Sequence, residues 1–167
     1  MRDDSQFNDP SRRSFTFKVR TTEAAPANRV LAPAPGSAAD PTLHGLQVTV
    51  YNGAGSGEFT VLTLPAGPQW ATLGTPSNPK GYRYKGLATD TVRKVMVKND
   101  QLKVVAKGAG FGYSLNEPQQ GSVGVRITAG GLVTWCGLSL PRPGLDVQDR
   151  FTGLTDSPAP AVCPVVP

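Results

Sequence analysis

Residues 92–107 read VRKVMVKNDQLKVVAK, a segment with the alternation of a β-hairpin. A two-residue turn at Asn99-Asp100 would join its two halves and set their register. In that register one face of the pair is apolar, with Val95, Val97, Leu102 and Val104. The opposite face carries mostly polar side chains, namely Lys94, Met96, Lys98, Gln101, Lys103 and Lys107. The segment therefore predicts two antiparallel strands with one buried and one hydrated face.

The rest of the chain repeats this pattern. Apolar and polar residues alternate in segments 15–20, 46–51 and 123–127, and segments 59–64 and 132–136 are rich in strand-forming residues. The 19 glycines and 16 prolines disfavour long helices and suit short strands joined by tight turns. The sequence predicts an all-β fold, an antiparallel β-sandwich or jelly roll of about nine short strands without a substantial helix.

The length of 167 residues is typical of one domain. Residues 1–13 are polar and charged, and they are expected to form an N-terminal arm. Residues 14–167 are expected to form a single β-sandwich domain that ends in a proline-rich C-terminal tail. No apolar run approaches the length needed to span a membrane, so a soluble protein without membrane insertion is expected.

The two cysteines bear on the cellular compartment. Cys136 ends a predicted strand, whereas Cys163 lies in the proline-rich tail. A disulfide between them would tie the tail to the sheet and close a loop of roughly 25 residues, worth about 3 kcal/mol. That pairing favours an oxidising compartment, and hence a secreted or extracellular protein. The alternative is two unrelated thiols, one buried and one idle.

The sequence predicts no catalytic residue, no metal site and no cofactor. A single histidine, His44, excludes a histidine-rich metal site within one chain. Glu58 and Glu117 each border a predicted turn, where a solvated carboxylate is more common than a member of a glycosidase pair. The spacing of a calcium-binding loop is absent around the remaining candidates, Asp40, Asp90 and Asp100.

Positive charge is concentrated in one part of the chain. The net charge is +5 overall, and residues 80–107 alone contain eight basic and two acidic residues. The hairpin register places four lysines on one sheet face, namely Lys94, Lys98, Lys103 and Lys107. These four lysines would attract an acidic polysaccharide or another surface polyanion, and nucleic acid is the less expected partner. The alternative is a solvated face that maintains solubility and discourages edge pairing.

Aromatic side chains give a second binding hypothesis, because flat rings stack on sugar faces. Tyr82 and Tyr84 share one face of a predicted strand and have Arg83 and Lys85 as neighbours. The candidate ligand-binding residues are Trp70, Tyr82, Arg83, Tyr84, Lys85 and Trp135. For both tryptophans, burial in the core is the alternative.

The side on which Trp135 lies depends on the length of the preceding turn. A two-residue loop at Gly130-Gly131 places Trp135 opposite Arg126 on the polar face. A three-residue loop that begins at Ala129 places it beside Val125 in the core.

Several short sequence motifs occur together in this chain, namely Trp70-Ala71-Thr72-Leu73-Gly74, Gly81-Tyr82-Arg83-Tyr84-Lys85, Leu115-Asn116-Glu117-Pro118-Gln119-Gln120-Gly121, Trp135-Cys136 and Cys163-Pro164. Together they resemble a family of β-rich modules of roughly 130 residues, found singly or in tandem in large secreted proteins of environmental bacteria. The resemblance covers residues 14–164, and it implies export, a single module and a terminal cysteine pair. Some similar modules have further cysteines, which this chain lacks. The family has no assigned activity, so the resemblance transfers no catalytic residue.

The leading functional hypothesis is a non-catalytic extracellular module that binds carbohydrate or another surface polymer. The second is a structural or adhesive module that packs against neighbouring modules or subunits, with the N-terminal arm as an added strand. The third is a small secreted glycan-active enzyme, which would require a cleft with two carboxylates or a metal.

Overall fold

The computed structural model describes residues 1–3, 9–21, 29–155, 157, 160 and 163. Within these residues the chain forms eleven β-strands, the short α-helix α1 (Pro41–His44) and the 3-10 turn η2 (Pro10–Arg12). Every strand pairing is antiparallel. The predicted all-β sandwich is confirmed, with two strands more than expected from the sequence.

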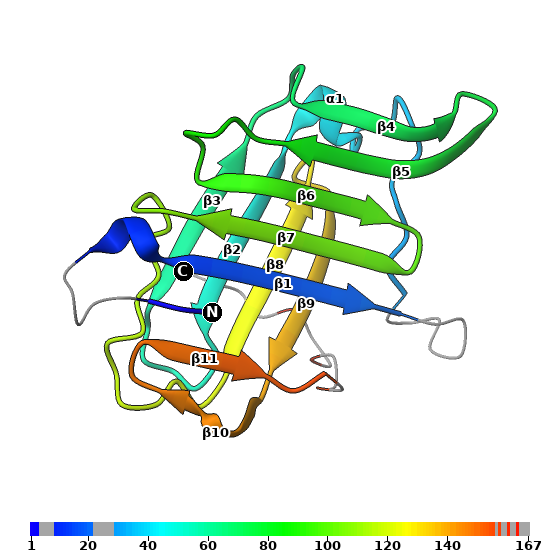
Figure 1. Ribbon diagram of the computed structural model, residues 1–167. Coiled ribbons are helices and arrows are strands. Elements are labelled where there is room, and N and C mark those ends of the chain that lie inside the picture. The colour runs from blue at the N-terminus through cyan, green and yellow to red at the C-terminus, as the bar shows by residue number, and fades with distance from the viewer. Residues whose placement is uncertain (4–8, 22–28, 156, 158–159, 161–162, 164–167) are drawn as a thin grey trace.

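Five strands form the front sheet of Figure 1, in the order β1-β7-β6-β5-β4. Their bounds are β1 (Ser14–Arg20), β4 (Trp70–Thr75), β5 (Asn78–Lys85), β6 (Val92–Lys98) and β7 (Gln101–Lys107). Strands β4 to β7 follow one another as a meander, and β1 completes the sheet beside β7. The front sheet therefore joins the first strand of the chain to strands that lie far from it in sequence.

The hairpin predicted from residues 92–107 is confirmed as β6 and β7. Val97 lies opposite Leu102 and Val95 opposite Val104, as the two-residue turn requires. All four side chains are fully buried. In the turn Asp100 has a φ of 63°, in the left-handed region that aspartate tolerates better than most residues. The alternation of this segment thus determines its buried face.

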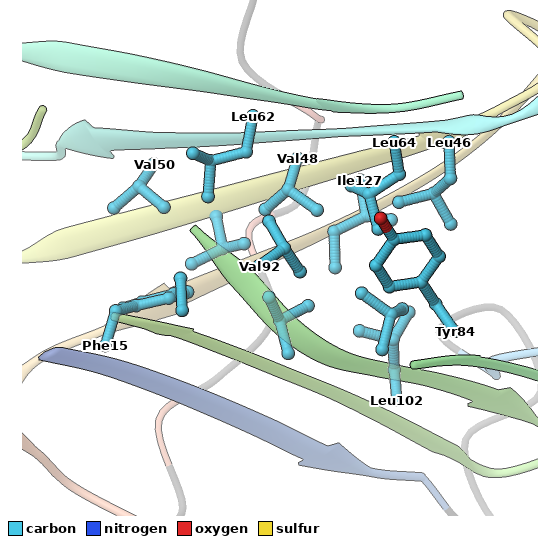
Figure 2. Close-up of a cluster of buried hydrophobic side chains, with 14 of the residues drawn as sticks. Phe15, Leu46, Val48, Val50, Leu62, Leu64, Tyr84, Val92, Leu102 and Ile127 are labelled. Atoms are coloured by element: carbon cyan, nitrogen blue, oxygen red, sulfur yellow. The ribbon is translucent and has the colours of Figure 1, made fainter. Parts of the chain in front are cut away.

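Four strands form the back sheet, which crosses behind the front sheet in Figure 1 in the order β3-β2-β8-β9. Their bounds are β2 (Leu46–Asn52), β3 (Phe59–Leu64), β8 (Val123–Ala129) and β9 (Val133–Ser139). The inner residues of the two sheets close over one apolar core, part of which is drawn in Figure 2. At one place the sheets approach closely, because a Cβ at Gly137 would lie 2.6 Å from the Phe17 ring.

A small third sheet lies at the lower end of the sandwich in Figure 1. It consists of β10 (Pro141–Val147) and β11 (Arg150–Gly153), which the sequence analysis did not single out as strands. Prolines at positions 141 and 143 obscured the pattern, although proline is tolerated in edge strands. Arg2 forms backbone bridges to Ser14 and to Arg150, and so connects this hairpin to the front sheet.

The first three residues pack against the domain, whereas residues 4–8 of the predicted arm lie outside the described residues. Asp3 is buried, and its carboxylate accepts hydrogen bonds from Arg13 Nε at 2.9 Å and from the Leu115 amide at 3.0 Å. A buried carboxylate needs such partners because it has lost its water. Residues 1–3 therefore belong to the folded unit.

The predicted disulfide is present. It joins Cys136 on β9 to Cys163, with the two Cα atoms 5.5 Å apart. Cys136 is directly opposite Arg126, whose side chain is on the outer side of the back sheet. The bond thus attaches Cys163 to the outer side of the back sheet, and the alternative of two unrelated thiols does not hold.

A basic sheet face as the candidate functional site

The outer face of the front sheet gathers eight cationic side chains. Because paired residues share a face and successive residues alternate, the register identifies every outward-facing position. We call these eight side chains the basic face: Lys18, Arg20, Arg83, Lys85, Lys94, Lys98, Lys103 and Lys107. They come from β1, β5, β6 and β7, which lie side by side toward the viewer in Figure 1.

Like charges oppose each other directly at two places on this face. Lys18 of β1 is the register partner of Lys103 of β7, and Lys85 of β5 is the register partner of Lys94 of β6. Cross-strand partners have Cβ atoms about 5 Å apart, where like charges destabilise a sheet. The basic face therefore carries an electrostatic cost in the absence of an anion.

No acidic residue compensates this charge within the front sheet, whose five strands contain neither aspartate nor glutamate. Among the residues that the structure describes, no salt bridge involves a member of the basic face. The nearby Asp100 is engaged elsewhere, since its carboxylate accepts from Arg29 at 2.6 and 2.8 Å. These hydrogen bonds hold the pKa of Asp100 below its usual value. The face is thus a field of unneutralised positive charge.

The basic residues identified from the sequence lie on this face. Arg83, Lys85, Lys94 and Lys107 are exposed, and Lys98 and Lys103 are half-buried. Two further members, the exposed Lys18 and Arg20, were not predicted from the sequence. Their alternation with Phe17 and Val19 was visible, but the pairing of β1 with β7 was not. That long-range pairing extends the basic face by one strand.

Three aromatic candidates are buried, which corrects the hypothesis that their rings stack on a sugar at the surface. Tyr82 has no exposed surface, and Trp70 and Tyr84 are each only 6% exposed. Trp70 contacts Tyr84 edge to face, with ring centroids 5.1 Å apart, and its indole N–H donates to the Pro65 carbonyl oxygen. These rings fill the core because the inner side of β5 faces the back sheet, so they cannot stack on a ligand.

Tyr82 also has a structural hydrogen-bond role. Its hydroxyl donates to the carbonyl oxygen of Pro33 at 3.1 Å. Burial, together with the negative charge of Asp40, raises the pKa of Tyr82 to about 12. The hydroxyl is therefore a protonated donor at neutral pH, and it ties β5 to the segment that precedes α1.

Trp135 lies on the core side of β9. The connection between β8 and β9 contains three residues, 130–132, and Trp135 is directly opposite Ile127. Both glycines of this turn have positive φ angles, 56° at Gly130 and 73° at Gly131. Trp135 therefore faces the core, as predicted for a three-residue turn. Its direct cross-strand partner is Ile127 and not Val125. Trp135 remains half-buried at the margin of the core.

The carboxylates considered for catalysis serve as hydrogen-bond acceptors for loops. Glu58 Oε1 accepts from the Ser114 amide and hydroxyl at 2.6 and 2.7 Å. Glu117 Oε2 accepts from Gln120 Nε2 at 2.7 Å. In the described part of the chain, no three His, Cys, Asp or Glu side chains are grouped so that they would hold a metal ion. These contacts give both glutamates a structural role, while Glu58 Oε2 is buried without a hydrogen-bond partner among the described residues.

Gln120 is the centre of a buried polar network at the end of the sandwich. Its side-chain oxygen accepts from the Tyr113 hydroxyl at 2.7 Å and from Asn52 Nδ2 at 3.2 Å. Asp146 accepts from the backbone amides of Gln120 and Gly121 at 2.8 and 2.9 Å. Burial, followed by the charge of Glu58, raises the pKa of Tyr113. The network fixes the long connection between β7 and β8.

Comparison of the chain with protein-family models, with curated proteins and with solved structures finds no match in any of the three. The resemblance to secreted bacterial modules therefore stays a prediction. None of the described helices has the length and apolar character of a membrane-spanning segment.

Proposed function

We propose that this domain is a non-catalytic, secreted module that binds an acidic polysaccharide through the basic face. The observation that carries the proposal is the direct opposition of Lys18 with Lys103 and of Lys85 with Lys94, without an acidic residue in the same strands. A bound polyanion would convert this repulsion into attraction, because each anionic group neutralises neighbouring cations and releases counterions.

The shape of the basic face supports a polymer as the ligand. Strands lie about 4.8 Å apart, and outward-facing residues recur about every 6.7 Å along a strand, so the cations form a broad grid. Such a grid contacts many weakly binding groups at once, as a repeating polymer offers. Met96 lies in the middle, between Lys103 and Arg83 in the register, and gives the grid an adaptable apolar centre.

An acidic polysaccharide is preferred to nucleic acid for two reasons. Binding of single strands usually relies on exposed aromatic rings, and the tyrosines of β5 are buried. The disulfide between Cys136 and Cys163 also favours an oxidising compartment outside the cytosol. A flat lysine-rich face without stacking rings suits carboxylate or sulfate groups on a sugar chain.

The test compares two double variants that remove the same amount of charge. Lys18→Gln/Lys94→Gln removes two exposed cations from the basic face, and Arg142→Gln/Arg150→Gln removes two exposed cations from the small third sheet. Affinities for polygalacturonate, dextran sulfate and neutral dextran are measured by isothermal titration calorimetry between 50 and 300 mM salt, with duplex DNA as a further ligand. All four ligands are titrated under the same conditions.

We expect the first variant to lose about tenfold or more in affinity for an acidic polysaccharide, with a shallower salt dependence. The control variant should lose less than about twofold, because its cations lie elsewhere. Equal losses in both variants would show that only net charge matters and would contradict the proposal. Tighter binding of duplex DNA than of either acidic polysaccharide, or no binding of either polysaccharide at 50 mM salt, would also contradict it.

A further inference from the structure

Strand β3 is an outer strand of the back sheet, and the β7–β8 connection lies close to its first residues at Gly112 and Thr60. Its sequence, FTVLTL, contains no charge and no proline, and it pairs with β2 over six consecutive positions without a register shift. Native sheets usually protect such edges with charges, prolines, bulges or a covering segment, because a free edge accepts another strand. The edge of β3 lacks the first three of these devices.

The other outer strands of the two main sheets are protected. Strand β4 has a bulge between Leu73 and Gly74, and β1 carries the charged side chains Lys18 and Arg20. Strand β9 carries the disulfide at Cys136. Among these four outer strands, β3 is therefore the one suited to accept a further strand.

One hydrogen bond identifies which backbone groups of β3 face away from β2. The Asn52 amide donates to the Glu58 carbonyl oxygen at 2.9 Å, which makes these two residues a hydrogen-bonded pair. Such pairs alternate along an antiparallel ladder. Residues 60, 62 and 64 therefore bond to β2, whereas the amides and carbonyls of Phe59, Val61 and Thr63 point to the open edge. An added strand would find a regular row of donors and acceptors.

A pocket of about 390 Å³ lies directly beside this edge. Residues 61–65 form one wall, and Gln69, Tyr84 and residues 90–92 form the rest. A strand paired with β3 would point alternate side chains toward the front sheet, where this pocket is located. Peptide recognition by strand addition commonly obtains its specificity from such a pocket.

The polar groups of the pocket would accept a cation. Asp90 contributes a half-buried carboxylate, one oxygen of which accepts from the Leu87 amide at 2.7 Å. The nearby Arg93 guanidinium is occupied by the carbonyl oxygens of Leu87 and Ala88. The charge of Asp90 is therefore not neutralised by Arg93.

Tyr84 adds a hydroxyl to the lining of the pocket. Its side chain is more than nine-tenths buried, and within the described part of the chain its hydroxyl makes no hydrogen bond. Figure 2 shows this hydroxyl directed toward the strand that carries Leu64, which also lines the pocket. The hydroxyl is not one of the fully enclosed polar atoms without a partner, so a polar group of a ligand in the pocket would replace water as its partner.

We propose that the edge of β3 binds an extended peptide segment as an additional strand, with a lysine or arginine side chain of that segment in the pocket beside Asp90 and Tyr84. This binding site is separate from the basic face, and it does not depend on the proposed function. A second copy of β3 is a poor occupant, because the sequence FTVLTL provides no cationic side chain for the pocket.

The test uses fluorescently labelled nine-residue peptides of alternating threonine and valine that differ only at the central position, which is lysine, norleucine or glutamate. Binding to the intact protein is measured by fluorescence anisotropy at 0.15 M salt. We expect the lysine peptide to bind about tenfold or more tightly than the norleucine peptide. The Asp90→Asn variant should reduce this preference to less than about twofold, while Arg142→Gln in the small third sheet should preserve it.

Main-chain pairing is tested by backbone methylation of the peptide, which leaves the protein unaltered. Two lysine peptides are N-methylated at alternate amides, one at the odd and one at the even positions. One of them should bind nearly as well as the parent, and the other should lose binding, because only every second amide faces β3. Val61→Pro removes an outward amide without affecting the ladder to β2, and it should abolish binding.

Three results would overturn the proposal. The first is that no peptide binds at millimolar concentration. The second is that both methylated peptides bind equally well. The third is a dimer in sedimentation equilibrium that Val61→Pro dissociates, which would identify a second copy of the chain as the occupant. If Val61→Pro loses peptide binding but still binds the polysaccharide, the peptide site and the basic face are independent of each other.

Discussion

Lys18 of β1 and Lys103 of β7 are direct cross-strand partners on the outer face of the front sheet. Like charges in direct cross-strand opposition destabilise an antiparallel pair by up to about 1 kcal/mol before screening by salt. Neither lysine forms a salt bridge with a described acidic residue. The pair therefore links the stability of the fold to the ionic environment of the basic face.

Replacement of Lys103 by glutamate is expected to stabilise the protein. The Lys103→Glu variant converts a repulsive pair into an attractive one, and we expect a gain of about 0.5–1 kcal/mol in the free energy of unfolding at low salt. Urea denaturation at 20 mM and 500 mM sodium chloride measures the gain, which should shrink at the higher concentration. Lys107→Glu is the matched control, because Lys107 lies opposite the uncharged Ser14. An equal gain in the control would refute the pairwise explanation.

Removal of the Asp146 carboxylate is expected to loosen the connection between β7 and β8. Asp146→Ala leaves the amides of Gln120 and Gly121 without their acceptor in a buried environment. We expect a loss of about 2–3 kcal/mol in the free energy of unfolding. Hydrogen exchange should show faster exchange of these two amides than of the Val95 amide in β6. Unchanged protection of Gln120 and Gly121 would contradict this assignment.

Reduction of the disulfide is expected to lower stability. Breaking the link between Cys136 and Cys163 opens a loop with a sequence separation of 27 residues, which the chain-entropy relation values at about 3.5 kcal/mol. Urea denaturation with and without dithiothreitol measures the loss. The Cys136→Ser/Cys163→Ser variant should match the reduced protein and show no response to dithiothreitol. A response of that variant would mean that the reductant acts elsewhere.

Asp40 is expected to make stability depend on pH in the acid range. Burial alone would raise its pKa, but hydrogen bonds from the Gly36 amide and from the amide and hydroxyl of Thr42 outweigh burial and lower it. A carboxyl with a lowered folded-state pKa stabilises the protein above its unfolded-state pKa of about 3.9. This contribution is lost as the pH falls through the folded-state value.

The Asp40→Asn variant tests this dependence. The difference in unfolding free energy between the native protein and Asp40→Asn should be constant from pH 7 to 5 and should shrink below about pH 4. Urea midpoints at pH 7, 5, 3.5 and 2.5 measure it. The exposed Asp9, replaced by asparagine, is the control and should produce a smaller difference. A gap that persists unchanged to pH 2.5 would contradict the role of Asp40.

Local alternation was sufficient to predict much of the front sheet. The segment 92–107 determined which side chains of β6 and β7 are buried, since the turn and the period of two are both properties of neighbouring residues. The same reasoning correctly placed Tyr82 and Tyr84 on one common face. It also identified the two cysteines that form the disulfide. Each of these results depends on residue types and spacing within the chain.

Only the tertiary structure decided what each face meets. Tyr82 and Tyr84 were expected at a binding surface, but the back sheet covers their side of β5 and places them in the core. The basic face gained Lys18 because β1 pairs with β7, more than 80 residues away in sequence. The free edge of β3 likewise depends on the order of strands in the back sheet.

The physical reason is that alternation repeats over two residues and is visible in any short segment, whereas strand order and sheet packing arise from contacts between distant segments. The sequence by itself therefore indicated most strands of the two main sheets and the two-sided hairpin, and it favoured the disulfide that the structure contains. Burial of apolar area across two sheets then selected which of the two faces of each strand became core, and which cations became neighbours.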